Sequence, residues 1–143
     1  MKAVLDANIW VSAFLAPKGT CGRIIDALRS GRLAVVSSPH LWSELQRAVA
    51  YERIRKPLER DGLWYDTQSF LAHQTDVVFV SDVQPTGSWV PNDPDDDWVI
   101  QCALTANADY VISGDRHLLS LGHVGEVRIL SPADFAAEVL EQP

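Results

Sequence analysis

The sequence is poor in residues on which several classes of protein depend. Only two cysteines, Cys21 and Cys102, occur in 143 residues, which gives neither a disulfide framework nor the paired spacing of a zinc site. Each is expected to be a small packed residue. No apolar run approaches the roughly 20 residues that cross a bilayer, and Asp6 follows Met1 too closely for a secretory signal. We therefore expect a cytoplasmic protein without a membrane segment.

Positive charge is also scarce. Nineteen Asp and Glu residues outnumber twelve Lys and Arg residues, and the formal net charge is −7 at pH 7. This balance argues against nonspecific nucleic-acid binding over the whole surface. The charges are nevertheless grouped: residues 47–60 contain five basic side chains, and residues 93–97 contain four aspartates. An acidic cation site with a basic rim would produce both groups, and so would chance on a solvated surface.

Apolar patterning, in contrast, is abundant. With 47% hydrophobic and 22% charged residues, the composition is typical of a soluble globular protein. The expected strands are residues 2–6, 33–37, 77–80, 109–113 and 126–130, and the expected helices begin near residues 9, 20, 39, 57, 94, 117 and 132, the fourth running to about residue 73. Strands alternating with helices predict an α/β fold with a parallel, helix-covered sheet. No repeat or linker divides the chain, so we expect a single domain over residues 1–143.

The run at residues 93–97 leads into a helix and carries more acid than a helix start requires. Asp93 can cap this helix with Pro94 at its first position, and negative charge in the first turn complements the macrodipole. Asp97 remains unexplained, because helical spacing places it on the apolar stripe of Ile100. A carboxylate there is costly unless a partner or a metal neutralises it. The stripe favours Asp97 as a ligand, and the register also allows Asp96 with Asp97 in support.

Four acids from distant parts of the chain are expected at one edge of the sheet. Asp6 and Asp115 each follow an apolar strand, while Glu44 and Asp97 lie early in helices that enter from the same edge. Sites in open parallel sheets form outside the carboxyl ends of the strands. Because unpaired carboxylates in one cleft repel each other, we expect them to hold Mg²⁺ or Mn²⁺, which prefer oxygen ligands. A cation held this way activates water in many nucleases.

The order and spacing of these acids resemble those of a known family, the PIN domain. The resemblance covers essentially the whole chain, and it is closest to a bacterial group of toxin components of toxin–antitoxin systems. It is carried by Val4-Leu5-Asp6-Ala7-Asn8, Glu44, Asp93-Pro94-Asp95-Asp96-Asp97 before Val99-Ile100 and Ala103-Leu104, and Ala108-Asp109-Tyr110-Val111-Ile112-Ser113-Gly114-Asp115.

The resemblance implies a three-layer α/β/α sandwich with a central parallel sheet of about five strands. It also implies a Mg²⁺- or Mn²⁺-dependent ribonuclease that acts on RNA, is neutralised by a cognate antitoxin and frequently forms a homodimer. Relatives often carry a second acid two residues after the last one, where this sequence has His117. The acids expected to hold the metal are Asp6, Glu44, Asp97 and Asp115, with Asn8, Asp96 and Asp93 in support.

Some residues outside the acidic site are candidates for contact with RNA. Arg53, Arg55 and Lys56 follow the helix that carries the second acid, and we expect them to meet backbone phosphates. Among the five tryptophans, Trp10, shortly after Asn8, and Trp89, in the loop that leads to the acidic run, are candidates for base stacking.

Two other functions remain open. A PIN-like fold can serve as a protein-binding module with weak or no catalysis, and metal-dependent cleavage would distinguish the two. A phosphotransfer protein that uses Asp6 as nucleophile would need a second acid where Asn8 stands. A calcium loop at residues 93–104 is excluded, because Trp98 replaces its glycine and Leu104 replaces its bidentate glutamate.

Overall fold

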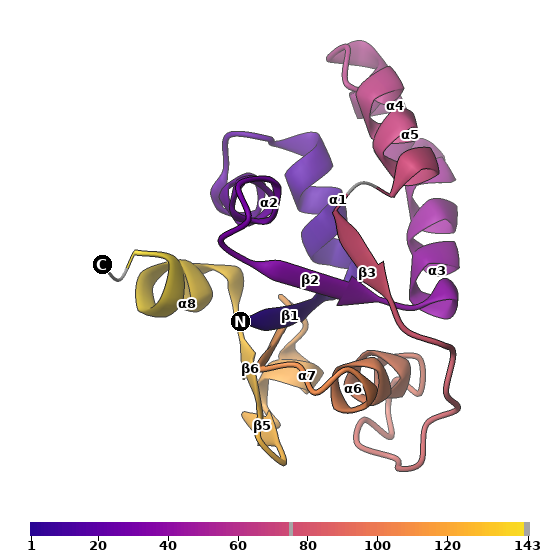
Figure 1. The fold of residues 1–143 in the computed structure, drawn as a ribbon. Coiled ribbons are helices and arrows are strands. Elements are labelled where there is room, and N and C mark those ends of the chain that lie inside the picture. Colours follow the sequence, from indigo (N-terminus) through magenta and orange to yellow (C-terminus); the bar gives the residue numbers. More distant parts are fainter. Residues whose placement is uncertain (75, 142–143) are drawn as a thin grey trace.

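The computed structural model describes residues 1–74 and 76–141. Within these ranges the strands form one sheet in the order β3-β2-β1-β4-β6-β5 (Figure 1). Neighbouring strands from β3 to β6 are parallel, which confirms the predicted parallel sheet. The strands are β1 Lys2–Leu5, β2 Ala34–Ser37, β3 Val77–Phe79, β4 Tyr110–Ile112, β5 His123–Val124 and β6 Val127–Leu130.

β5 is an additional strand that the sequence did not reveal. It pairs antiparallel with β6, with Val124 opposite Val127. Gly125 follows at a φ of 57°, a left-handed conformation that glycine adopts without steric cost, and the resulting tight turn closes a hairpin. The strand is two residues long, which is too short to show the alternation by which a strand is recognised.

Helices cover both faces of the sheet and produce the expected three-layer α/β/α sandwich (Figure 1). The apolar cluster on one face includes residues of α1 Ala7–Leu15, α2 Thr20–Arg29, α3 Pro39–Ala50, α4 Glu52–Arg60, α5 Trp64–His73, and α8 Pro132–Phe135 with the π-helical turn Ala136–Leu140. The cluster on the other face includes α6 Asp96–Thr105 and α7 Arg116–Leu119.

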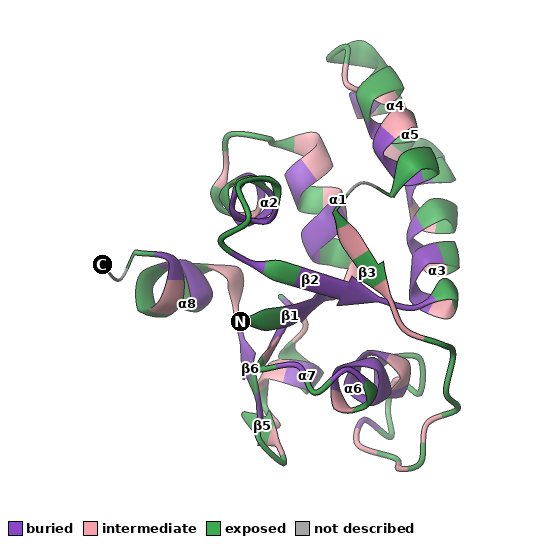
Figure 2. Cartoon of the chain, in the orientation of Figure 1, coloured by how far each residue is buried: buried purple, intermediate pink, exposed green. Residues whose placement is uncertain are grey.

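The central strands explain why there are two clusters. In β1, Leu5 belongs to the first cluster and Val4 to the second, and in β2 the same division separates Val35 from Val36. Figure 2 shows both strands buried except at their first residues. Successive side chains of a strand point to opposite faces, so a strand that is apolar at every position is stable only between two layers of helices.

The helices after the third differ from the expectation. α4 begins at Glu52 and contains Pro57 in its interior, and a separate helix α5 begins at Trp64. The prediction of one helix from Pro57 to about His73 is therefore wrong. Proline is common in the first turn of a helix, which is why Pro57 was expected to begin one. Here Pro57 lies inside α4, and the buried side chain of the next residue, Leu58, packs the helix against the core.

The start of α3 is as predicted. The backbone N–H of Leu41 donates to Ser38 Oγ at 3.3 Å, and Pro39 occupies the first turn. This cap sets the direction in which α3 leaves the carboxyl end of β2. Among the described residues, none of the helices combines the length and the apolar character that a bilayer crossing requires.

Candidate metal centre

Asp6 stands where β1 passes into α1, at the carboxyl edge of the sheet. It is the N-cap of α1, and its Oδ1 accepts from the N–H of Ala7 at 2.8 Å. Its Oδ2 accepts from Ser113 Oγ at 2.7 Å. Burial raises the pKa of Asp6 above its ordinary value, the hydrogen bonds oppose this rise, and the charges of Asp115 and Asp93 add to it. Asp6 is thus a fixed carboxylate in an acidic environment.

Asp115 reaches the same edge from β4. It caps the short helix α7, because its Oδ1 accepts from the N–H of His117 at 2.7 Å. The N–H of Asp115 in turn donates to Ser113 Oγ at 2.9 Å. The fully buried hydroxyl of Ser113 therefore bonds to both Asp6 and Asp115, and holds the ends of β1 and β4 in one arrangement.

Ser113 was not among the residues selected from the sequence. Its only signal there is a small polar residue at the end of an apolar strand, two positions before an acid. We expect Ser113→Ala to cost about 1–3 kcal/mol of unfolding free energy, because the partly buried N–H of Asp115 loses its acceptor and Asp6 Oδ2 loses its donor. We also expect cation affinity to fall about 10- to 100-fold, as for other residues that orient metal ligands.

Calorimetric titration with Mn²⁺ and thermal melting measure these two effects of Ser113→Ala. Ser120→Ala is the matched control, since Ser120 is an exposed serine that donates to the carbonyl of His117. Equal Mn²⁺ affinities for Ser113→Ala and Ser120→Ala would contradict the positioning role.

The acidic run supplies Asp93 and Asp96. α6 begins at Asp96, its N-cap residue is Asp95, and no side-chain hydrogen bond caps it. The N–H of Asp96 donates to the carbonyl of Asp93 at 3.0 Å. The predicted N-cap role of Asp93 is therefore wrong. Asp96 is only 7% exposed, and its Oδ2 has no hydrogen-bond partner among the described residues. Burial first, and then the charges of Asp6, Asp93 and Asp115, raise the pKa of Asp96 to about 8.

These acids converge on one hollow. Carboxylate oxygens of Asp93, Asp96 and Asp115 lie within 4.8 Å of one another. Asp6 lines the same hollow of about 370 Å³, together with Asn8 and with residues of α3 and α4. The donor set consists of oxygens and includes a buried carboxylate oxygen without a partner, which is the chemistry that hard divalent cations match. The described residues therefore fit a Mg²⁺ or Mn²⁺ ion.

Asp97 does not join this cluster. Its Oδ1 accepts from the N–H groups of Trp89 and Val90, both at 2.9 Å. The buried carboxylate is thus satisfied by the backbone of the loop that precedes α6. The predicted burial of Asp97 is thus observed, and its bonding partners are in this loop. The structure brings Asp96 rather than Asp97 together with the other acids, and which aspartate of the run holds a metal stays a prediction.

Glu44 also lies apart from the hollow. Its Oε1 is 3.1 Å from His40 Nε2, and these two side chains form a separate group with Asp95, in which potential ligand atoms lie within 4.8 Å of one another. The His40 ring stacks on Trp98 with centroids 3.9 Å apart. Burial raises the pKa of Glu44, and His40 opposes the rise. The expectation that Glu44 meets the other three acids in one cleft is not met in this structure.

The basic residues of α4 differ in their surroundings. Arg53 lines the acidic hollow, whereas Lys56 pairs with Glu52 at 2.7 Å. Arg55 pairs with Glu59, and its guanidinium lies 5.0 Å from the centre of the Trp64 ring. Only one of the three expected phosphate contacts is therefore adjacent to the acids.

The tryptophan candidates also change. Trp10 is in the core, in edge contact with Trp42 and tilted against Phe70. Its suggested contact with substrate is wrong, because α1 turns this position away from the hollow that Asn8 lines. Trp89 is partly buried against the apolar cluster around α6.

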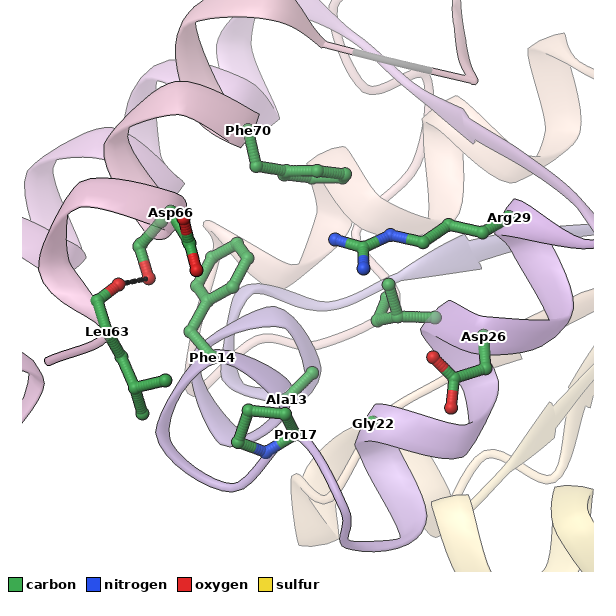
Figure 3. Close-up of a pocket in the computed structure, with 11 residues that line it drawn as sticks. Ala13, Phe14, Pro17, Gly22, Asp26, Arg29, Leu63, Asp66 and Phe70 are labelled. Atoms are coloured by element: carbon green, nitrogen blue, oxygen red, sulfur yellow. Dashed lines mark hydrogen bonds between the residues drawn. The ribbon is translucent and has the colours of Figure 1, made fainter. Parts of the chain in front are cut away.

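A second hollow, away from the acids, is mostly apolar (Figure 3). Its volume is about 150 Å³, and α1, α2 and α5 contribute its walls. Phe14 and Phe70 form part of the lining, and the guanidinium of Arg29 lies 5.6 Å from the centre of the Phe70 ring. Asp26 and Asp66 also line this hollow, so an apolar floor is combined with an acidic rim.

The three-layer α/β/α fold, with carboxylates gathered at the carboxyl edge of its sheet, places this chain among α/β proteins with a candidate metal centre. Residues 2–117 match the family model described as PIN domain, and the chain belongs to the PIN domain family. It is 26% identical over 121 residues to the uncharacterized protein MJ1680 of Methanocaldococcus jannaschii, covering 85% of this chain and 75% of that protein.

The fold also has a solved counterpart. It is similar to a chain in the crystal structure of VapBC2 from Rickettsia felis bound to a DNA fragment from their promoter. The TM-score is 0.61 at 13% sequence identity, and the match covers 92% of this chain and 98% of that one. At this identity the similarity establishes the fold.

Proposed function

We propose that this protein is a Mg²⁺- or Mn²⁺-dependent endoribonuclease and the toxin of a toxin–antitoxin pair. The observation that carries the proposal is the buried, unpartnered carboxylate oxygen of Asp96 beside Asp93 and Asp115. Such an arrangement is unfavourable in the absence of a cation, because like charges are held together out of water. Membership of the PIN domain family supports the same chemistry.

In this proposal Asp93, Asp96 and Asp115 would hold the cation, and Asp6, which lines the same hollow, would bind it or its water. Ser113 fixes the orientation of Asp6. A divalent cation in this hollow would supply an activated water and neutralise charge on the scissile phosphate. Side chains around the hollow would place the scissile phosphate and its neighbouring nucleotides against the acids.

The test is cleavage of a circular single-stranded RNA, because only an endonuclease can open it. Linear product should form with Mg²⁺ or Mn²⁺ and disappear with chelator. A single-stranded DNA circle of the same sequence distinguishes ribonuclease from general nuclease activity. Intact RNA circles with either cation, at protein concentrations that bind the RNA, would contradict the proposal.

Cation binding should also stabilise the fold. A ligand at 100 times its dissociation constant adds about 2.7 kcal/mol to the unfolding free energy, so Mn²⁺ should raise the melting temperature by several degrees. Asp6→Asn should reduce this response, while Asp109→Asn, a substitution at the opposite end of the sheet where Asp109 Oδ2 accepts from the N–H of Lys2, should retain it. Melting that is indifferent to chelator and to Mn²⁺ would count against the metal centre.

The acidic cluster predicts the pH dependence of the cation-free protein. In the unfolded chain Asp96 releases its proton near its ordinary pKa of 3.8, whereas the folded protein retains that proton up to about pH 8. The protonated carboxyl of Asp96 therefore contributes to the unfolding free energy. This contribution is fully present below the ordinary pKa and is lost as pH rises through 8. Melting in chelator between pH 5 and 8.5 should show this decline, and Asp96→Asn should flatten it. A decline of equal slope in Asp96→Asn would assign it to other groups.

An antitoxin and a second copy of this chain are the proposed protein partners. The solved structure with the similar fold is described as VapBC2 bound to a promoter DNA fragment. The hollow in Figure 3 offers an apolar floor with Asp26 and Asp66 at its rim, which suits an apolar partner side chain flanked by basic residues. The same hollow favours the second candidate function, a protein-binding module, which predicts partner binding without RNA cleavage.

A further inference from the structure

The junction between α3 and α4 presents an exposed aromatic ring beside the acidic hollow. Tyr51 ends α3 and also precedes the first residue of α4, with extended backbone angles of φ −62° and ψ 138°. This single non-helical residue turns its side chain outward, and Tyr51 is 58% exposed. Ala48, Arg53 and Ile54, on either side of it in sequence, all line the hollow. Tyr51 does not line the hollow itself, but it is flanked in sequence by residues that do.

Arg53 is the basic residue next to this ring. Its guanidinium carbon lies 5.8 Å from the centre of the Tyr51 ring, a favourable cation–π distance. Among the described residues, no carboxylate forms an ion pair with Arg53, unlike the other basic side chains of α4, which pair in the combinations Arg55–Glu59, Lys56–Glu52 and Arg60–Asp61.

Helical spacing explains why Arg53 is different. Residues four apart lie on the same side of a helix and form its ion pairs. Arg55 and Lys56 each have a glutamate at that distance, whereas the residues four positions before and after Arg53 are Val49 and Pro57. Arg53 thus keeps its charge available at the edge of the acids, where a strand lying over the hollow brings its phosphates.

Four of the five tryptophans pack against other side chains. Trp10 and Trp42 pack against each other in the core, Trp98 stacks on His40, and Trp64 lies under Arg55. Tyr51 also has a guanidinium near its ring, but it is 58% exposed. An exposed ring next to a positive charge is the arrangement that binds nucleic-acid single strands, because a base stacks on the ring and the charge meets the backbone.

We propose that Tyr51 and Arg53 form a nucleotide platform, in which Arg53 holds a backbone phosphate and Tyr51 stacks an unpaired base beside the hollow. This inference rests on the proposed nuclease function. It adds a substrate requirement to it: the nucleotide at Tyr51 must be unpaired, because a base within a duplex is already stacked and has no free face for the ring.

Binding, rather than cleavage, tests the platform. Short RNA strands carrying 2-aminopurine at successive positions are titrated with protein in Ca²⁺, a cation with similar oxygen ligands, and gels confirm that the strands stay intact. Wild type should quench 2-aminopurine at one or two adjacent positions. Tyr51→Leu should abolish that quenching and weaken single-strand binding about tenfold, while Tyr51→Phe should preserve both and duplex affinity should not change.

Matched controls come from the same chain. Tyr65, on α5, is 80% exposed, and among the described residues no basic side chain lies over its ring as Arg53 does over that of Tyr51, so Tyr65→Leu should bind like wild type. Arg53→Gln should reduce the slope of log affinity against log salt by about one, the value for one lost phosphate contact. Arg55→Gln and Lys56→Gln, whose parent side chains are already paired, should leave the slope unchanged. The melting temperature checks that each variant is folded.

The outcomes separate this inference from the nuclease proposal. If wild type opens RNA circles but Tyr51→Leu binds single strands as tightly as Tyr65→Leu, the platform is overturned and the nuclease remains. Equal losses on single-stranded and duplex RNA would also overturn it, because stacking requires an unpaired base. If wild type neither binds nor cleaves RNA, the proposed function fails, and the platform with it.

Discussion

Asp96→Asn should abolish metal-dependent RNA cleavage, and Asp97→Ala should instead lower stability. The two residues are adjacent in sequence but have different surroundings. Asp96 has an unpartnered buried oxygen next to Asp93 and Asp115, whereas Asp97 accepts two backbone N–H groups of the preceding loop. Cleavage by Asp96→Asn should fall by more than about 100-fold, since even residues that only orient metal ligands contribute about 10- to 100-fold.

The effect on stability should be the reverse, small for substitution of Asp96 and large for substitution of Asp97. Removing the charge of Asp96 relieves repulsion in the cation-free protein, so Asp96→Asn should melt at the same temperature as wild type or higher in chelator. Asp97→Ala leaves the buried N–H of Val90 and that of Trp89 without an acceptor, which should cost about 2–4 kcal/mol. Asp97→Asn retains a carbonyl acceptor and should cost less.

Melting in chelator, Mn²⁺ titration and circle cleavage on the three variants test this assignment. If Asp97→Asn loses Mn²⁺ binding and Asp96→Asn keeps it, the assignment of the ligand to Asp96 is wrong. If all variants cleave like wild type, α6 does not contribute to a nuclease centre.

Trp10→Ala should lose about 3–5 kcal/mol of unfolding free energy, the usual cost of truncating a large buried aromatic side chain. Trp10 is 2% exposed and contacts the rings of Phe14, Trp42 and Phe70. It therefore joins α1 to α3 and α5, and α1 is the helix that begins after Asp6.

Trp10→Phe separates this core role from a contact with substrate. It keeps a ring in the cluster, so it should lose less stability than Trp10→Ala while leaving RNA affinity in Ca²⁺ unchanged. Denaturant unfolding and RNA titration measure the two quantities. A Trp10→Phe variant of wild-type stability that binds RNA tenfold more weakly would restore Trp10 as a substrate contact.

The sequence by itself determined the layers of the fold and the positions of two acids. Strands that are apolar at every residue, such as Val4 and Leu5 in β1, are stable only between two helical layers. Asp6 and Asp115 could be placed because Asp6 directly follows β1 and Asp115 comes three residues after the end of β4. The end of a buried parallel strand is a local feature, and topology brings such ends to one edge.

The same reasoning did not reach groups whose positions depend on packing between distant segments. Ser113 bonds to both Asp6 and Asp115. These bonds join the ends of β1 and β4, and the pairing of these strands cannot be read from the sequence. Glu44 was expected beside Asp6, yet its helical neighbour His40 and Asp95, on the turn before α6, form a group with it instead.

Only the tertiary structure decided whether Asp96 or Asp97 joins Asp93 in the hollow. Both Asp96 and Asp97 are buried in the first turn of α6, and helical periodicity alone favoured Asp97. The loop before α6 presents the N–H groups of Trp89 and Val90 to that residue. A buried carboxylate is stable where donors meet it, so Asp97 is held by the loop, and Asp96 is the one left facing the acids, where a cation can neutralise it.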